Sequence, residues 1–196
     1  DSQSFHKESS KKTVLITTQN FEWTNALLNT NQFINVESIF QKIFDIFDDR
    51  PEIELKLKLH PARDPYNEFL KDRIKKMNTK IQILQSEPSK SVIEDCDLLV
   101  NIHSELIPST TMLEGLILQK PILNITLLQN KKFDYDDFEA VHTVFHTNLD
   151  KQDFEKLLFD SKSRNRLIQN GQKYVHYFLA NPGVSSIYFS KLLNNL

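Results

Sequence analysis

The chain has 196 residues, of which 39% are hydrophobic and 26% are charged, and its formal net charge is -2. This balance provides both a core and a solvated surface, so it excludes a disordered chain, and it lacks the basic excess that nucleic-acid binding needs. The single cysteine, Cys96, can form neither an internal disulfide nor a paired-cysteine zinc site, so we expect a reducing compartment.

Strands are predicted to alternate with helices along almost the whole chain. Residues 1–12 are polar, and we interpret them as a linker or cut end that more protein precedes. From Thr13 onward, short β-branched runs alternate with segments whose apolar residues recur three and four apart. Strands are predicted at 13–19, 53–60, 80–85, 97–103, 121–128 and 142–147, and helices at 31–49, 64–78, within 87–96, at 110–119 and from 150 onward, with a break near 180–186.

This alternation indicates βαβ units, and therefore an α/β, Rossmann-like open parallel sheet of about six strands with helices on both faces. We expect residues 13–196 to form a single domain. The strand at 53–60 alternates leucine with lysine, which predicts a position near a sheet edge with lysine stems reaching solvent. The segment 133–141 is predicted to be an acidic, solvated loop.

Several classes of site are excluded. The chain has only three glycines, so neither a dinucleotide fingerprint nor a phosphate-binding P-loop can be present. No paired His-x-x-x-His or Asp-rich loop suggests a metal site. No apolar run approaches the roughly twenty residues that span a bilayer, and we predict no transmembrane segment.

Polar residues cluster where the predicted strands end. His60 closes the second strand, Ser86 and Glu87 follow the third, and residues 103–111 follow the fourth. Ligands of open parallel sheets bind beyond these carboxyl ends, and a helix N-terminus stabilises a phosphate. We therefore expect the hydroxyls that open the helix at 110–119 to form an anion site.

A purely structural interpretation of the same residues stays open at this point. Serine and threonine are preferred helix caps, and Thr111 with Glu114 fits a capping box, as does Ser91 with Glu94. The Glu114 carboxylate therefore binds either a backbone N–H or a ribose diol. His60 is either a ligand contact or a structurally bonded histidine.

Two motifs together resemble one family. "LKLHP" (57–61) and "STTMLEGLILQKPILNI" (109–125) resemble the C-terminal, donor-binding half of GT-B glycosyltransferases. The resemblance is greatest to bacterial sialyltransferases, polysialyltransferases, capsule-polysaccharide enzymes and CDP-glycerol glycerophosphotransferases, and the tail at 164–193 resembles their closing helices. Gln119 replaces the usual glycine before the Lys-Pro pair, which we expect to alter only the helix C-cap. The matching residues are Ser109, Thr110, Glu114, Gly115, Leu116, Lys120, Pro121 and Ile122.

The resemblance implies a nucleotide-binding domain with defined roles for its residues. His60 would contact the donor phosphate, as a hydrogen-bond donor or as a general acid toward the leaving nucleotide. Glu114 would bind the ribose hydroxyls. The remaining contacts would come from Ser109, Thr110 and Thr111 at the phosphate and from Gln85 and Ser86 at the base.

The resemblance also sets expectations for partners. The substrate would be a nucleotide-activated sugar, or a polyol phosphate donor, with no cofactor and no metal. The acceptor-binding half would lie in a missing N-terminal domain, so we expect the isolated domain to be an inactive part of a glycosyltransferase, used in the synthesis of a surface polysaccharide or glycan. The alternatives are a sugar-nucleotide 2-epimerase-like enzyme and a non-catalytic interaction module, for which a homodimer is expected. We predict a cytoplasmic location, with peripheral association with the inner membrane face as a variant of it.

Overall fold

The computed structural model describes residues 11–18, 31–61, 65–78, 80–103, 109–130 and 132–179. The six strands in these ranges form one sheet of order β3-β2-β1-β4-β5-β6, and every neighbouring pair is parallel. The strands are β1 (Lys12–Thr18), β2 (Ile53–Lys58), β3 (Gln82–Leu84), β4 (Leu98–His103), β5 (Ile122–Thr126) and β6 (His142–Phe145). The helices are α2 (Asn31–Phe47), α3 (Pro65–Met77), α4 (Ser89–Glu94), α5 (Thr110–Ile117), α6 (Asp134–Asp137), α7 (Lys151–Phe159) and α8 (Ser161–Phe178), with a 3-10 turn η1 (His146–Asn148).

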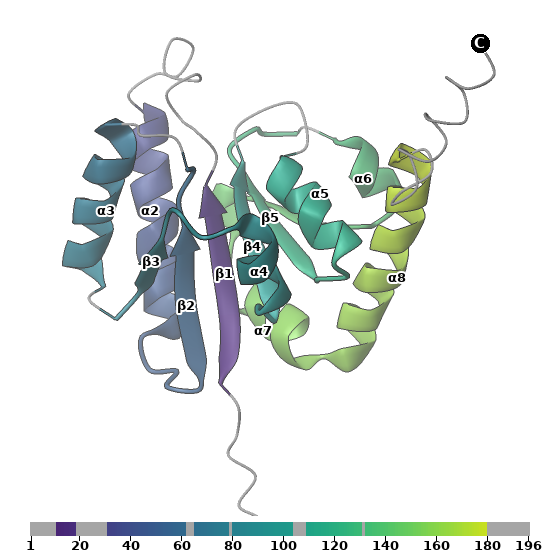
Figure 1. The fold of residues 1–196 in the computed structure, drawn as a ribbon, viewed down its shortest axis with the longest axis horizontal. Helices are drawn as coiled ribbons and strands as arrows, with labels where there is room; N and C mark the ends of the chain where they lie inside the picture. The colour runs from purple at the N-terminus through teal and green to yellow at the C-terminus, as the bar shows by residue number, and fades with distance from the viewer. Residues whose placement is uncertain are drawn as a thin grey trace, which may run out of the picture.

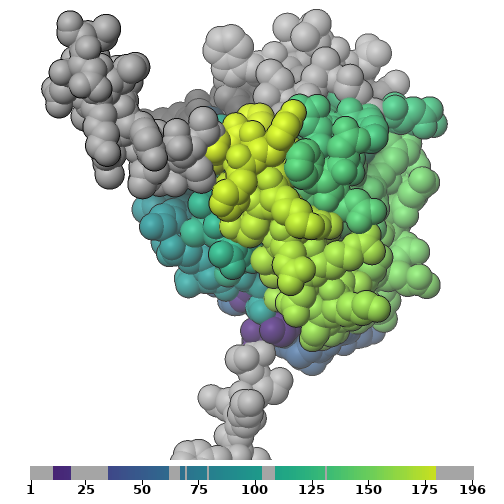
Figure 2. Space-filling model, turned by 90° about the vertical axis from the view of Figure 1, so that its right-hand side faces the viewer, coloured from purple at the N-terminus to yellow at the C-terminus, as the bar shows by residue number. Residues whose placement is uncertain are grey.

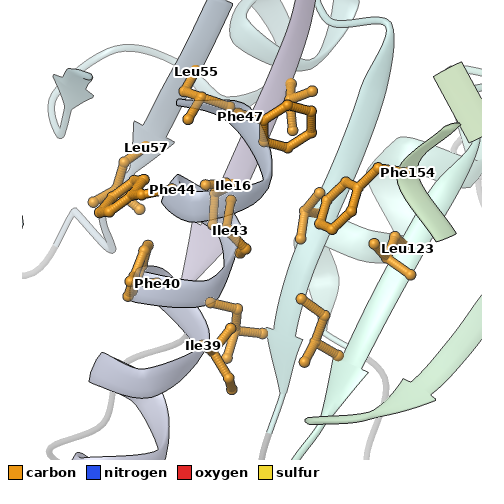
Figure 3. Packing of buried hydrophobic residues seen from close by; sticks show 14 of the residues in the cluster. Ile16, Ile39, Phe40, Ile43, Phe44, Phe47, Leu55, Leu57, Leu123 and Phe154 are labelled. Atoms are coloured by element: carbon orange, nitrogen blue, oxygen red, sulfur yellow. The ribbon is translucent and has the colours of Figure 1, made fainter. Parts of the chain in front are cut away.

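Helices cover both faces of the sheet (Figure 1). On one face α2, α3 and α7 pack against the apolar side chains of β1, β2, β4 and β5. Figure 3 shows the phenylalanines of α2 on this face, where the ring of Phe47 meets that of Phe154 from α7 edge-on at 5.0 Å. On the other face α4, α5, α6 and α8 form a second cluster. The predicted three-layer parallel architecture is therefore confirmed.

The predicted acidic loop at 133–141 is wrong, because its centre is a short helix with a buried anchor. Tyr135 of α6 is fully buried, stacks on Phe133 at 5.0 Å and meets Tyr174 of α8 edge-on at 6.2 Å. In Figure 2, α8 (yellow) lies beside the green surface of α6. The aromatic residues hold this segment against α8 while its aspartates stay near the surface. The predicted break at 180–186 lies outside the described residues.

Both predicted capping boxes are wrong. The α4 helix begins one turn early, with Pro88 as its N-cap, so Ser91 lies inside the helix and its hydroxyl donates to the Pro88 carbonyl at 2.9 Å. The α5 helix is capped by Ser109 rather than Thr111. The observed N-caps therefore precede the predicted ones by three positions in α4 and by two in α5.

The C-terminus of α5 is a Schellman motif, in which Gln119 takes the left-handed position. The Lys120 N–H donates to the Gly115 carbonyl at 2.9 Å, and the Gln119 N–H donates to the Leu116 carbonyl at 3.1 Å. Gln119 has a φ of 57°, where glycine is usually found. Lys120 also caps α4, since its Nζ donates to the Glu94 and Cys96 carbonyls at 2.7 and 2.9 Å.

The substitution Gln119→Gly is expected to stabilise the domain by about 0.5–1 kcal/mol, because glycine adopts positive φ without a Cβ penalty. The gain should appear as a higher urea midpoint with an unchanged slope. Gln169→Gly in the middle of α8 is the matched control and should destabilise the domain instead. A loss of stability on Gln119→Gly would contradict the assigned backbone conformation.

Within the described ranges, no helix combines the length and apolar character that crossing a membrane requires.

Candidate functional site

The predicted site residues lie at one edge of the sheet, over four consecutive strands. His60 follows β2, Gln85 and Ser86 follow β3, and Ser109 joins β4 to α5. Because all strands are parallel, these positions share the carboxyl edge. The chain order reverses between β1 and β4, and ligands of doubly wound sheets bind at this switch point. His60 follows β2 and Ser109 follows β4, and only β1 lies between these two strands. The ends of β2 and β4 are therefore about 10 Å apart.

The N-terminus of α5 is held by the Ser109 side chain. Its Oγ accepts the Met112 N–H at 3.0 Å and donates to Asn101 Oδ1 at 3.1 Å. The hydroxyl proton of Ser109 is therefore already used. Within the described part of the chain, the Thr110 and Thr111 N–H groups and hydroxyls make no hydrogen bond and are the available donors at this helix end.

Two buried oxygen atoms at this edge lack partners. Glu114 Oε2 and Thr18 Oγ1 are both inaccessible to solvent and make no hydrogen bond to the described residues. Thr18 ends β1 at the switch point. Glu114 lies one turn after Thr110, and because helical Cα–Cβ bonds tilt toward the N-terminus, its side chain leaves the backbone toward the start of α5. An unpaired buried oxygen costs stability, and the predicted backbone-capping role of Glu114 is not seen.

The backbone around His60 is fixed by two buried polar side chains. Asn67 of α3 is 2% exposed, and its Nδ2 donates to the His60 carbonyl at 3.0 Å. Lys58, at the end of β2, donates from Nζ to the Leu59 carbonyl at 3.0 Å and to the Gln85 carbonyl at 2.7 Å. Lys58 is 7% exposed, so the predicted solvent-reaching position is wrong for this lysine.

The pKa of Lys58 reflects its burial. Burial lowers the pKa of the Lys58 ammonium, and the Glu87 carboxylate opposes this shift. Glu87 also accepts the Gln85 N–H at 2.8 Å, which shapes the loop after β3. The ends of β2 and β3 are thus connected through the buried side chain of Lys58.

A row of polar side chains crosses the sheet beneath this edge, and sequence reasoning missed it. Each member is the direct register partner of the next on the neighbouring strand. Four of the five are at most 7% exposed, and Thr143 is half-buried. The row consists of Lys58 (β2), Thr17 (β1), Asn101 (β4), Asn124 (β5) and Thr143 (β6). A signal was available in β4 (LLVNIH) and β5 (ILNIT), where an asparagine interrupts an apolar run.

Hydrogen bonds run along most of this row. Thr17 Oγ1 lies 3.4 Å from Asn101 Oδ1, Asn101 Nδ2 donates to Asn124 Oδ1 at 3.0 Å, and Asn124 Nδ2 donates to Tyr135 Oη at 3.0 Å. Burial raises the pKa of the Tyr135 hydroxyl well above its ordinary value, so it stays neutral. At the far end Thr143 donates to Asp136 Oδ1 at 2.9 Å.

A hollow of about 450 Å³ lies elsewhere, along β6 and between α6, α7 and α8. Its lining includes Thr143 and Asp136 but none of the predicted site residues. Among the described residues, no three His, Cys, Asp or Glu side chains gather closely enough to hold a metal ion.

No protein-family model matches the sequence, and no curated protein matches it significantly. Solved structures do share the fold. A putative UDP-N-acetylglucosamine 2-epimerase from Listeria monocytogenes aligns with a TM-score of 0.58 and 12% identity over 86% of this chain and 43% of its own. MnaA from S. aureus, solved with UDP, aligns with a TM-score of 0.57 and 15% identity over 86% of this chain and 44% of its own.

The C-terminal domain of a group 1 glycosyltransferase (LpcC) from Francisella tularensis aligns with a TM-score of 0.53 and 16% identity over 85% of both chains. This chain thus spans less than half of the L. monocytogenes and S. aureus structures but most of the isolated C-terminal domain. The narrower resemblance to sialyltransferases and capsule enzymes stays a prediction. The described chain has the Rossmann-like α/β fold that was expected for one half of a GT-B protein.

Proposed function

We propose that this domain binds the nucleotide of an activated donor and forms the donor-binding half of a cytoplasmic glycosyltransferase. The transferred group would be a sugar or a polyol phosphate, used in the synthesis of a surface polysaccharide or glycan. The observation that carries the proposal is the unpaired, buried Glu114 Oε2. It lies one turn beyond a helix N-terminus at the sheet's switch point, and a ribose hydroxyl would satisfy it once the carboxylate turns toward the ligand.

The remaining geometry supports specific roles around this carboxylate. The free N–H groups and hydroxyls of Thr110 and Thr111 would bind phosphate oxygens, assisted by the helix dipole. Ser109 would position this turn, since its proton is donated to Asn101. His60 would approach the same phosphates from the end of β2 and stabilise the departing nucleotide, with Gln85 and Ser86 beside the base.

The complete enzyme would need a second domain for the acceptor. The L. monocytogenes and S. aureus structures are more than twice as long as the aligned part of this chain, and the F. tularensis structure is a C-terminal domain by itself. MnaA was solved with UDP, which supports a nucleoside diphosphate as the first ligand to test.

Calorimetric titration with UDP, CMP and CDP tests the proposal. We expect at least one of them to bind with micromolar affinity and His60→Ala to weaken it about tenfold or more, because a hydrogen bond to a charged phosphate contributes about 1.5–3 kcal/mol. His176→Ala on exposed α8 is the matched control and should bind normally. Binding weaker than millimolar for all three nucleotides, with no rise in melting temperature, would favour the interaction module instead.

A second candidate is a sugar-nucleotide 2-epimerase, which the similarity to the L. monocytogenes structure favours. It predicts a preference for UDP and no acceptor. Incubation of the complete protein with UDP-N-acetylglucosamine would produce an epimer in that case, whereas a transferase would leave the sugar configuration unchanged.

A further inference from the structure

The polar row beneath the carboxyl edge occupies positions where aliphatic side chains would fold at lower cost. Lys58, Thr17, Asn101 and Asn124 are buried on a face that is otherwise packed by leucine, isoleucine and aromatic residues. Burying an amide or an ammonium group costs desolvation free energy, and the hydrogen bonds of that group do little more than offset this cost. Apolar replacements of buried polar groups are therefore often neutral or stabilising. The row therefore needs an explanation beyond the stability of the sheet.

Lys58 joins the two loops on one side of the switch point. Its ammonium group bonds the carbonyl of Leu59, directly before His60, and the carbonyl of Gln85, directly after β3. The Leu59 N–H also donates to the Leu84 carbonyl at 2.8 Å. The backbone that carries His60 and the backbone of the β3–α4 loop are thus fixed to each other by one side chain.

Asn101 has the equivalent place on the other side of the switch point. Its Oδ1 accepts the Ser109 hydroxyl, and its amide is oriented by Asn124 Oδ1. Because the proton of Ser109 points to Asn101, its lone pair is directed at the Met112 N–H. The direction of the first turn of α5, and of the Thr110 and Thr111 N–H groups, follows from this bond.

We propose that Lys58 and Asn101 are positioning residues that set the geometry of the ligand site from below, without touching the ligand. This inference rests on the proposed function for the identity of the ligand. Lys58 holds the His60 backbone and the β3–α4 loop in one arrangement, and Asn101 holds the N-terminus of α5. Lys58 acts directly on the two loop carbonyls, whereas Asn101 is itself held within the row by its bond to Asn124.

The test compares isosteric apolar variants with matched controls in the complete chain. Lys58→Met removes the two bonds to the loop carbonyls, and its control is Lys56→Met on the same face of β2, where the lysine lies 3.4 Å from Glu54. Asn101→Leu removes the bond to Ser109, and its control is Val100→Ala, which removes buried apolar volume on the opposite face of β4. Lys58→Gln replaces Lys58→Met if that variant does not fold.

Two readouts separate positioning from stability. In the ligand-free protein, NMR should show a shifted or split His60 imidazole signal for Lys58→Met, and shifted Thr110–Met112 amides for Asn101→Leu. The dissociation constant for UDP should rise about tenfold in each variant, as the loss of one orienting hydrogen bond predicts. Both controls should keep the wild-type signals and UDP affinity, even though Val100→Ala lowers the melting temperature.

The outcomes distinguish this inference from the proposed function. If UDP binds the wild type and both variants equally and the His60 and α5 signals do not change, Lys58 and Asn101 are not positioning residues, whereas the proposed function stands. If none of UDP, CMP and CDP binds the wild type, the proposed function fails, and the imidazole and amide signals of the ligand-free variants still decide whether these residues fix the loops.

Discussion

The substitution Glu114→Leu is expected to raise the melting temperature of the ligand-free protein while weakening UDP binding by roughly 10- to 100-fold. The carboxylate has one buried oxygen without a partner, so its removal relieves a desolvation cost of about 1 kcal/mol or more, equivalent to about 2–4 °C for a domain of this size. In the complex the carboxylate, turned toward the ligand, would accept a ribose hydroxyl, and a charged hydrogen bond contributes about 1.5–3 kcal/mol. Thermal scans and calorimetry measure the two effects.

The opposite signs of these effects are the diagnostic feature. Glu94→Leu at the end of neighbouring α4 is the matched control, since Glu94 is exposed and forms only a 3.7 Å ion pair with Lys90. It should change neither quantity measurably. Glu114→Gln keeps one acceptor oxygen, so its melting temperature and its UDP affinity should lie between those of the wild type and those of Glu114→Leu. If Glu114→Leu binds UDP as the wild type does, the ribose assignment is wrong.

Gly115→Ala is expected to destabilise the domain by about 1–3 kcal/mol, although alanine has the higher helix propensity. A Cβ at this position would lie 2.5 Å from Leu99 Cδ2 and 3.1 Å from Ile122 Cδ1. Both neighbours are fully buried in the sheet, so α5 would have to move away from β4 and β5. Because Ser109 and Glu114 are on the same helix, UDP affinity should fall as well.

A double-mutant cycle with Leu99→Val checks the cause of this loss. Leu99→Val alone should destabilise, but it should recover part of the stability lost in Gly115→Ala, since the clashing methyl group is withdrawn. Gly171→Ala on α8 is the comparison, because its Cβ would meet only the end of Leu116 at 2.9 Å, with nothing else nearer than 3.8 Å. Additive losses in the cycle would show that close packing of α5 is not the reason.

The architecture was predictable because its signal is periodic. The alternation of apolar strands with amphipathic helices predicted the parallel sheet, and the positions of His60 and Ser109 at a common edge followed from that topology alone. The α6 helix was not predictable in this way, since it has only four residues and is fixed by Tyr135 contacting Tyr174 from a distant segment.

The details of the site needed the three-dimensional contacts. Ser109 satisfied both a capping and a binding interpretation, and only its bond to Asn101 shows where its proton goes. The Leu-Lys alternation of β2 predicted a solvated lysine, but Lys58 lies where the Leu59 and Gln85 carbonyls converge. A local pattern records polarity and spacing, whereas the partner of a buried polar group comes from another strand or loop.

The polar row has a consequence for how the strands find their alignment during folding. In a parallel sheet buried on both faces, a strand displaced by one residue exchanges one apolar face for another, and alternation alone penalises the error weakly. Here a slip of β4 against β5 in either direction would place Asn101 and Asn124 opposite aliphatic side chains, with their hydrogen-bonding groups unpaired. The polar row therefore helps to specify the register of the strands. Aliphatic substitutions in the row would leave a sheet that still collapses, but alternative registers would be penalised less.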